Sequence, residues 1–215
     1  MKSRPILFSA PMVRALRDGS KTQTRRVCKT RTQGQTDIIG YALMEDMNEA
    51  DDGTREGEAW KRIPCPYGVP GDQLWVRESF ACFGSSDSIT PPVPRGCQIR
   101  FLADRNTPDP TCWVPMPADA KKPTPSLRGK PSIHMPRWAS RITLEIESVR
   151  IERLQDISEE DAMAEGCGYL LAEHEYLDGN PDQYRQCYRI LWEQINGPGS
   201  WNANPWVWAL EFKRL

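Results

Sequence analysis

The chain has 215 residues, of which 39% are hydrophobic and 27% are charged. This length predicts one domain with insertions, since domains cluster near roughly 100 to 200 residues. The composition favours a soluble globular protein over charge-rich disorder. The longest strictly apolar run, residues 206–210, is far shorter than the ~20 residues that a membrane-spanning helix needs. The sequence therefore predicts no membrane partner.

The net charge of −1 arises from 28 Lys and Arg against 29 Asp and Glu. Because the net charge is nearly zero, the chain as a whole does not attract nucleic acid electrostatically. A nucleic-acid partner would have to bind a local, positively charged patch. Only three apolar residues follow Pro5 at the amino terminus, too few for a secretory signal, which predicts a cytoplasmic protein. Seven cysteines are far below the ~8–10% of disulfide scaffolds, and we expect them to be reduced thiols.

The cysteine spacing argues against a metal site. Neighbouring cysteines are never fewer than 15 residues apart, and His134 and His174 lie outside the H-x-E and P-C-x-x-C pattern of zinc deaminases. We therefore predict no metal and no cofactor.

The first predicted elements are a strand at residues 5–8 and a helix at residues 11–18, with Pro11 in its first turn and Gly19 after its end. Residues 20–24 are expected to form a loop that carries Lys21 and Thr24, before a strand that begins near residue 25. The acidic residues 45–58 favour a solvated loop.

A strand is predicted at residues 73–83, where Leu74, Val76 and Glu78 alternate with Trp75 and Arg77. Residues 91–136 then hold eleven of the nineteen prolines. Since proline disfavours long helices and central strands, we expect an irregular insertion or lid there.

The second half predicts a strand at residues 141–153 that bends near Glu147 and Ser148, as a strand does around a small barrel. A short helix follows, capped by Ser158 and ended by Gly166, with Glu165 in its last turn. A longer helix spans residues 180–197, and a closing strand follows. The buried stripe of the longer helix is expected to comprise Tyr184, Cys187, Tyr188, Leu191, Trp192 and Ile195. The predicted class is α+β, with a small bent β-barrel, flanking helices and a proline-rich insertion.

A cationic corner lies between Arg14 and Arg31, where seven Lys and Arg face only Asp18, a local charge of +6. It can be a solvated helix face and strand edge. Alternatively it can be a cradle for phosphates, with Trp75 and Trp138 as stacking surfaces.

Within this corner, Gly19, Lys21, Thr24 and Arg26 match the pattern G-x-K-x-x-T-x-R, and residues 71–74 match G-D-x-L. These motifs, with the strand and acidic helix at residues 154–166, resemble the ASCH domain of the PUA-like superfamily. The resemblance covers about residues 4–31, 68–83, 137–168 and 204–215. The whole chain also resembles longer ASCH-like proteins commonly encoded by phages and prophages. If the chain is phage-encoded, the expected cytoplasm is that of the bacterial host. The resemblance implies one domain, residues 1–215, with insertions near 30–67 and 84–136.

Some small bacterial ASCH proteins are amidohydrolases that remove the acetyl group of N-acetylcytidine. The resemblance implies that Lys21, Thr24 and Glu165 are catalytic and that Arg26 accompanies them. The residue types agree with this, because burial and neighbouring cations such as Arg25 lower the pKa of a lysine base, which can activate a threonine hydroxyl. A carboxylate at a helix C-terminus is also unfavourable by ~0.3–1 kcal/mol, which suggests a functional reason for Glu165.

The expected substrate is a nucleoside or a single-stranded nucleic acid with a modified base. Glu78 is the rival acid, or else forms a buried ion pair with Arg77 or Arg26. The alternative function is a non-catalytic RNA- or DNA-binding module, and a nuclease is a weaker third. Lys21, Thr24 and Glu165 also have structural readings, as a phosphate contact, a strand former and a solvated helix end. The candidate substrate-binding residues are Arg26, Arg25, Trp75, Arg77, Glu78 and Trp138.

Overall fold

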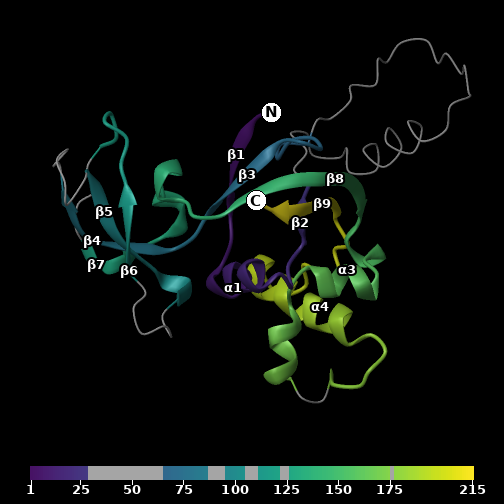
Figure 1. The fold of residues 1–215 in the computed structure, drawn as a ribbon. Coiled ribbons are helices and arrows are strands. Elements are labelled where there is room, and N and C mark those ends of the chain that lie inside the picture. The colour runs from purple at the N-terminus through teal and green to yellow at the C-terminus, as the bar shows by residue number, and fades with distance from the viewer. Residues whose placement is uncertain (29–64, 87–94, 105–110, 122–125, 175–176) are drawn as a thin grey trace, which may run out of the picture. The chain divides into compact units, whose positions relative to one another are not determined.

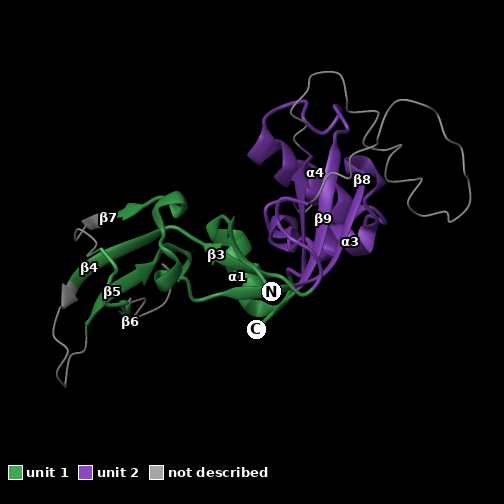
Figure 2. Cartoon of the chain, turned by 90° about the horizontal axis from the view of Figure 1, so that it is seen from above, with its two compact units in different colours: residues 1–20, 71–145, 213–215 green, residues 21–70, 146–212 purple. Residues whose placement is uncertain are grey.

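The computed structural model describes residues 1–28, 65–86, 95–104, 111–121, 126–174 and 177–215. They form an α+β fold, as the sequence predicts, with the elements shown in Figure 1. The chain divides into two compact units, coloured separately in Figure 2: residues 1–20, 71–145 and 213–215, and residues 21–70 and 146–212. The description as a single domain with insertions stays a prediction.

Unit 1 contains a small sheet and a helix that follow the sequence expectation closely. Strand β1 (Ser3–Leu7) is parallel to β3 (Gln73–Arg77), and β3 is antiparallel to the first residues of β8 (Thr143–Arg153). Helix α1 (Ala10–Asp18) buries Met12, Val13 and Leu16. Gly19 ends the helix with φ 85°, a left-handed conformation that glycine adopts without strain.

Unit 1 also contains a four-stranded antiparallel sheet in the order β6-β5-β4-β7. Its strands are β4 (Phe80–Ser86), β5 (Gly96–Phe101), β6 (Thr111–Pro115) and β7 (Ser126–Lys130). The expectation of an irregular segment without central strands is therefore wrong, because β5 is central. Pro115 stands at the end of edge strand β6, where no ladder hydrogen bond is lost.

One face of this sheet covers a hydrophobic core that includes Phe80, Ile99, Phe101 and Met135. Three short 3-10 helices belong to the same unit: η2 (Leu102–Asp104), η3 (Ser132–His134) and η4 (Arg137–Ala139). In the core, Cys82 and Cys97 on neighbouring strands form a disulfide. The expectation of reduced thiols is wrong for this pair, because antiparallel pairing brings the two side chains together.

Unit 2 contains the rest of β8, strand β9 (Trp206–Arg214) and β2 (Gln23–Val27), in the order β8-β9-β2. Strand β2 is antiparallel to β9. The helices among its described residues are η5 (Leu154–Asp156), α3 (Glu159–Ala164), η6 (Gly168–Ala172) and α4 (Gln183–Asn196), and α3 packs against α4. These elements hold the candidate site.

Local sequence signals place the helices of unit 2 well. The Ser158 hydroxyl accepts a hydrogen bond from the Asp161 N–H at 3.1 Å, which confirms the predicted cap of α3. Gly166 follows with φ 74°. The buried stripe of α4 is confirmed for Cys187, Tyr188, Leu191 and Trp192, but the prediction is wrong for Ile195, which is 60% exposed in the last turn.

Other sequence expectations are only partly covered. Strand β8 continues through Glu147 and Ser148, and no pairing among the described strands closes a sheet on itself, so the barrel stays a prediction. Most of the insertion near 30–67, with the acidic residues 45–58, lies outside the described residues. Across the described ranges, every helix is too short or too polar to span a bilayer.

Candidate functional site

Two residues that are far apart in the sequence meet in unit 2. Lys21 and Glu165 form an isolated antiparallel bridge, next to a hydrogen bond of 2.9 Å from the Thr22 N–H to the Ala164 carbonyl. Gly19 ends α1 before Lys21, and Gly166 follows Glu165 after α3. The two helix ends thus fix both backbones at the place where the side chains meet.

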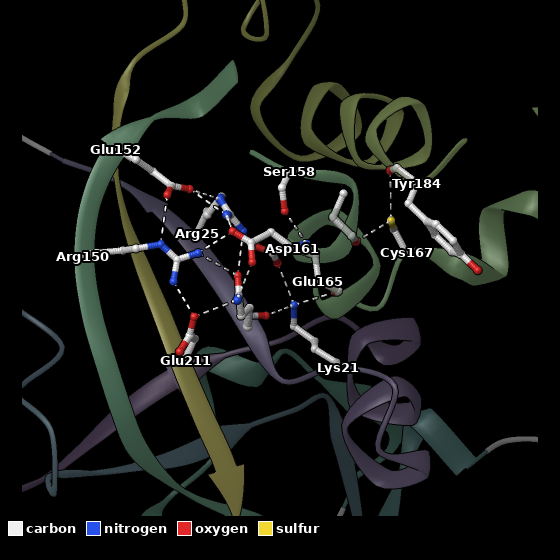
Figure 3. A network of polar contacts seen from close by, with 12 residues as sticks. Lys21, Arg25, Arg150, Glu152, Ser158, Asp161, Glu165, Cys167, Tyr184 and Glu211 are labelled. Carbon is white, nitrogen blue, oxygen red and sulfur yellow. Dashed lines mark hydrogen bonds and ion pairs between the residues drawn. The ribbon is translucent and has the colours of Figure 1, made fainter. Parts of the chain in front are cut away.

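The Lys21 ammonium is buried and fully engaged, with a residue exposure of 3%. It donates to the Gln23 carbonyl at 2.7 Å, to the Glu165 carbonyl at 2.7 Å and to Glu165 Oε2 at 2.8 Å (Figure 3). An ammonium has three N–H donors, so these acceptors match its capacity. The reading of Lys21 as an exposed phosphate contact is therefore wrong, and Glu165, 3% exposed, is not a solvated helix end.

Burial controls the proton affinity of Lys21. Loss of water around the ammonium lowers its pKa below the ordinary value; the Glu165 carboxylate opposes this shift, and the Arg26 charge adds to it. The expected combination of burial and a cationic neighbour is thus present. Lys21 is easier to deprotonate than an exposed lysine.

Arg25 is the second cation of the site, and its side chain is completely buried. Its guanidinium donates to Glu165 Oε1 at 3.2 Å, to Asp161 Oδ2 at 2.7 Å and to Glu152 Oε1 at 2.6 Å. Burial acts to lower the pKa of Arg25, but the Glu165 and Glu152 carboxylates raise it above the ordinary value. Arg25 therefore stays charged and holds the Glu165 carboxylate in place beside Lys21.

An outer layer of polar side chains surrounds Arg25 (Figure 3). Arg150 bridges Glu152, Asp161 and Glu211, and the Gln23 amide donates to Asp161 at 2.8 Å and to Glu211 at 3.0 Å. Sequence reasoning missed this layer. The available signal was the alternation of Ser148, Arg150 and Glu152 with apolar residues on β8, which indicates one polar face.

Thr24 lies in strand β2 and not in a loop, so that expectation is wrong. The side chains of Gln23 and Arg25 reach Asp161 and Glu165, so Thr24, at the alternate position, is on the opposite strand face. Thr24 is 4% exposed and lies opposite Leu210. The hydrogen bonds of 2.7, 2.7 and 2.8 Å from Lys21 Nζ go to the Gln23 and Glu165 carbonyls and to Glu165 Oε2. Arg26 shares the strand face of Thr24.

The described cations of the corner include exposed residues on α1 and buried residues in unit 2. In unit 1, Arg14 donates to the Ala103 carbonyl at 3.2 Å and Arg17 pairs with Asp104. In unit 2, Lys21 and Arg25 are occupied as described above. The solvated helix face therefore describes Arg14 and Arg17, which are exposed on α1. Lys21 and Arg25 are buried and paired, and they fit neither the solvated face nor the phosphate cradle. The corner's Lys29 and Arg31 lie outside the described residues.

Glu78, the rival acid, belongs to unit 1. Its carboxylate receives two hydrogen bonds from Arg141, at 2.8 and 2.9 Å, and Arg141 also pairs with Asp104. The suggested partners Arg77 and Arg26 are therefore wrong, because Arg141 forms the ion pair with Glu78. Burial raises the pKa of Glu78, and the hydrogen bonds from Arg141 oppose that shift.

The aromatic candidates also have their described contacts within unit 1. The Arg77 guanidinium lies 5.2 Å from the centre of the Trp75 ring, and Arg137 lies 5.9 Å from it. Arg77 also donates from Nε to the Met135 carbonyl at 3.0 Å. Trp138 packs against the core of the four-stranded sheet. Trp75, Arg77 and Trp138 thus support the structure of unit 1.

Among the described residues, no group of three or more His, Cys, Asp and Glu is arranged to hold a metal ion. Comparison with protein-family models, with curated proteins and with solved structures gave no match.

Proposed function

We propose that the protein hydrolyses the amide of an N-acylated, cytidine-type nucleoside or nucleic-acid base, as a relative of the ASCH domain with a PUA-like fold. The observation that carries the proposal is the buried pair of Lys21 and Glu165, with 2.8 Å between Nζ and Oε2. The proposed catalytic residues are Lys21, Thr24 and Glu165, with Arg26 beside them. These roles are the ones that the resemblance to the ASCH domain implies.

The chemistry of the pair supports acid–base catalysis. Burial lowers the pKa of Lys21, so the ammonium loses its proton to solvent more readily than an exposed lysine does and leaves a neutral amine beside the Glu165 carboxylate. The neutral amine of Lys21 is then a base, a role that a permanently charged arginine cannot perform. Because Arg17, Lys21 and Arg25 are already paired with carboxylates, phosphate binding at the corner is the weaker proposal.

The proposed reaction has two halves. Lys21 takes the Thr24 hydroxyl proton while the Thr24 oxygen attacks the amide carbonyl, and Arg26 or loop N–H groups stabilise the oxyanion. Lys21 returns the proton to the departing exocyclic amine, which leaves an ester on Thr24. The Glu165 carboxylate then takes a proton from water, and the resulting hydroxide attacks the ester carbonyl. Glu165 gives that proton to the Thr24 oxygen as the ester bond breaks, which releases the carboxylic acid and restores the threonine hydroxyl.

The geometry adds one requirement to this scheme. Since all three donors of the ammonium are engaged and Thr24 is on the other strand face, Lys21 must exchange a hydrogen bond when substrate binds. The Gln23 carbonyl belongs to the peptide that joins Gln23 to Thr24. Replacing the hydrogen bond to this carbonyl with one to the Thr24 hydroxyl therefore requires the smallest displacement of the Lys21 amine along the chain. Substrate binding therefore supplies the energy for the exchange.

The test is a chromatographic assay of cytidine release from N4-acylated cytidines. Glu165→Gln should lower turnover by about 10²–10⁴-fold, the usual contribution of a positioned acid or base. Glu78→Gln is the matched control, because Glu78 is an equally buried carboxylate paired with an arginine in unit 1. It should leave turnover within about twofold. Equal losses in both variants, or no release by the wild type with any acyl group, would reject the proposal.

A second pair of variants tests the nucleophile. Thr24→Ala should abolish hydrolysis, whereas Thr22→Ala, at the exposed neighbouring threonine, should retain it. If Thr24→Ala keeps full turnover, the Lys21–Glu165 pair activates water directly and the ester intermediate is wrong.

A further inference from the structure

Glu165 is presented by the end of a very short helix. Helix α3 comprises six residues, and isolated helices shorter than about 12–15 residues are marginal in water. Glu165 follows directly as the C-cap residue of α3, and its N–H donates to the Asp161 carbonyl at 3.0 Å. The place of the Glu165 carboxylate therefore depends on the contacts that hold α3 against its neighbours.

The first turn of α4 holds both ends of α3. At the start of α3, the Glu159 carboxylate accepts hydrogen bonds from the Tyr184 N–H at 2.7 Å and from the Arg185 N–H at 3.0 Å. After the end of α3, the Cys167 thiol donates to the Tyr184 carbonyl at 3.5 Å. Tyr184 thus contributes its N–H to one end of α3 and its carbonyl to the other.

The Cys167 thiol bridges the two helices (Figure 3). It also reaches the Ala162 carbonyl of α3 at 3.2 Å, so one S–H is shared between a carbonyl of α3 and one of α4. The Cys167 side chain is completely buried. Burial raises the pKa of the thiol, which therefore keeps its proton and remains a donor. Because Cys167 lies two residues after Glu165, the bridge restrains the backbone from which the carboxylate projects.

A second contact from α4 reaches the same site one turn further along the helix. The Arg25 guanidinium carbon lies 6.0 Å from the centre of the Tyr188 ring, and Arg25 donates to Glu165 Oε1 at 3.2 Å. Trp201 packs edge-on against Tyr188, with 6.2 Å between the ring centres. Helix α4 therefore contacts both the backbone that carries Glu165 and the cation that holds its carboxylate.

We propose that Cys167, together with Glu159 at the other end of α3, is a positioning residue of the Lys21–Glu165 site. The two residues tie α3 to α4 and keep Glu165 Oε2 at 2.8 Å from Lys21 Nζ. Cys167 acts through Glu165 and takes no part in the chemical steps. Its effect on turnover rests on the proposed function, but its effect on the position of Glu165 is measurable without a substrate.

The pKa of Lys21 reports where the Glu165 carboxylate lies. Burial lowers this pKa, the nearby carboxylate raises it, and the Arg26 charge lowers it. A negative charge on Cys167 would also raise it, but the neutral thiol carries none. When Glu165 moves away from the ammonium, the pKa of Lys21 therefore falls further.

The test is an NMR titration of the protein with 13C-labelled lysine, in which the Lys21 signal is the one lost in Lys21→Arg. Cys167→Ala removes the shared donor and should lower the pKa of Lys21, whereas Cys167→Ser keeps a donor and should retain the wild-type value. Cys187→Ala is the matched control, because Cys187 is an equally buried thiol on α4. It leaves the contact with the Tyr184 carbonyl in place and should not change the pKa of Lys21.

A second pair of variants keeps the test decisive if Cys167→Ala unfolds. Glu159→Gln leaves one acceptor oxygen for two N–H groups and should also lower the pKa of Lys21. Glu160→Gln removes the same charge from the exposed neighbouring residue of α3 and should lower it less. Equal shifts in Cys167→Ala and Cys187→Ala, or equal shifts in Glu159→Gln and Glu160→Gln, would overturn the proposal.

Turnover of N4-acetylcytidine adds a readout that loss of stability alone does not move. Cys167→Ala should lower kcat about tenfold or more with little change in KM, since a displacement of about 1 Å in a catalytic group can cost ~10²-fold. The rising limb of kcat/KM should move to lower pH. Cys187→Ala should keep kcat within about twofold of the wild type, and an equal loss there would contradict the positioning role. If the wild type hydrolyses no acylated cytidine while Cys167→Ala still lowers the pKa of Lys21, the proposed function fails and the positioning role stands.

Discussion

Each unit contains a carboxylate that is almost completely buried and paired with a cation, but the cations differ. In unit 1, Glu78 is held by two hydrogen bonds from Arg141. In unit 2, Glu165 is shared by Lys21 and Arg25. An arginine keeps its proton in any protein environment, whereas a buried lysine changes its pKa readily. Only the cluster of unit 2 therefore contains a cation that can act as a base, and the contrast separates a structural ion pair from a candidate catalytic one.

The largest expected effect on folding comes from removal of Arg25. Arg25→Met leaves Glu165, Asp161 and Glu152 without their shared, fully buried donor. Loss of one partner of a buried pair costs about 3–5 kcal/mol, which urea unfolding will measure. Arg150→Met is the control, because Arg150 is 35% exposed, and it should cost about 1 kcal/mol or less. Equal losses would show that Arg25 does not organise the cluster.

Arg141→Met tests the cluster of unit 1. It should lower the free energy of unfolding by about 1–3 kcal/mol at neutral pH, because the buried Glu78 carboxylate loses its donor. Burial already raises the pKa of Glu78, and the change raises it further. A carboxyl group whose pKa is raised by folding lowers the free energy of unfolding at pH values above its ordinary pKa near ~4.3. This destabilisation disappears as the pH falls and the group becomes protonated. The loss should therefore be smaller in urea unfolding at pH 5 than at pH 8, and a larger loss at pH 5 would contradict this account.

The pH dependence of turnover sharpens the assignment of Lys21 as a base. Its neutral form is the active one, so kcat/KM should rise with pH up to the pKa of Lys21, which burial holds below 10.5. Arg26→Gln removes a charge that lowers this pKa, so the rising limb should move to higher pH. A shift to lower pH, or a rate without a rising limb, would contradict the assignment. The position of the limb is independent of any loss of rate caused by Arg26 itself.

The smallest expected effect is at the edge of the cluster in unit 2. The hydrogen bond of 2.7 Å from Ser148 is the main cause of a lowered pKa at Glu211. A depressed carboxyl pKa contributes stability above the ordinary value near ~4.3, and this is lost as the pH falls through the lowered pKa. Ser148→Ala should therefore cost less than about 1 kcal/mol at pH 7, with a smaller difference from wild type at pH 3. Urea unfolding at the two pH values measures both, and a larger difference at pH 3 would be inconsistent.

The sequence predicts the ends of helices well, because glycine and serine act there through contacts with neighbouring residues. Gly19 and Gly166 end helices, and Ser158 caps one. The meeting of Lys21 with Glu165 was implied by the resemblance to the ASCH domain and not by a local pattern. The prediction that residues 91–136 contain no central strand was wrong. The eleven prolines of this long segment are unevenly spaced, and the six residues of β5 include none of them.

The partners of buried charges were the hardest to predict. Arg141 pairs with Glu78 and Asp104 over separations of 63 and 37 residues, and neither separation leaves a periodic signal. The face of Thr24 depended on whether its segment is a loop or a strand, and pairing of β2 with β9 decided this. Tertiary pairing, which no local pattern encodes, thus determined which polar side chains meet.

The central claim is that Lys21 acts as a base and not only as a buried cation. The most direct test is turnover of N4-acetylcytidine by Lys21→Arg, which preserves the charge beside Glu165 but removes the capacity to accept a proton. We expect a loss of about 10²–10⁴-fold in a protein whose thermal unfolding shows that it is still folded. Full turnover by folded Lys21→Arg would contradict the claim.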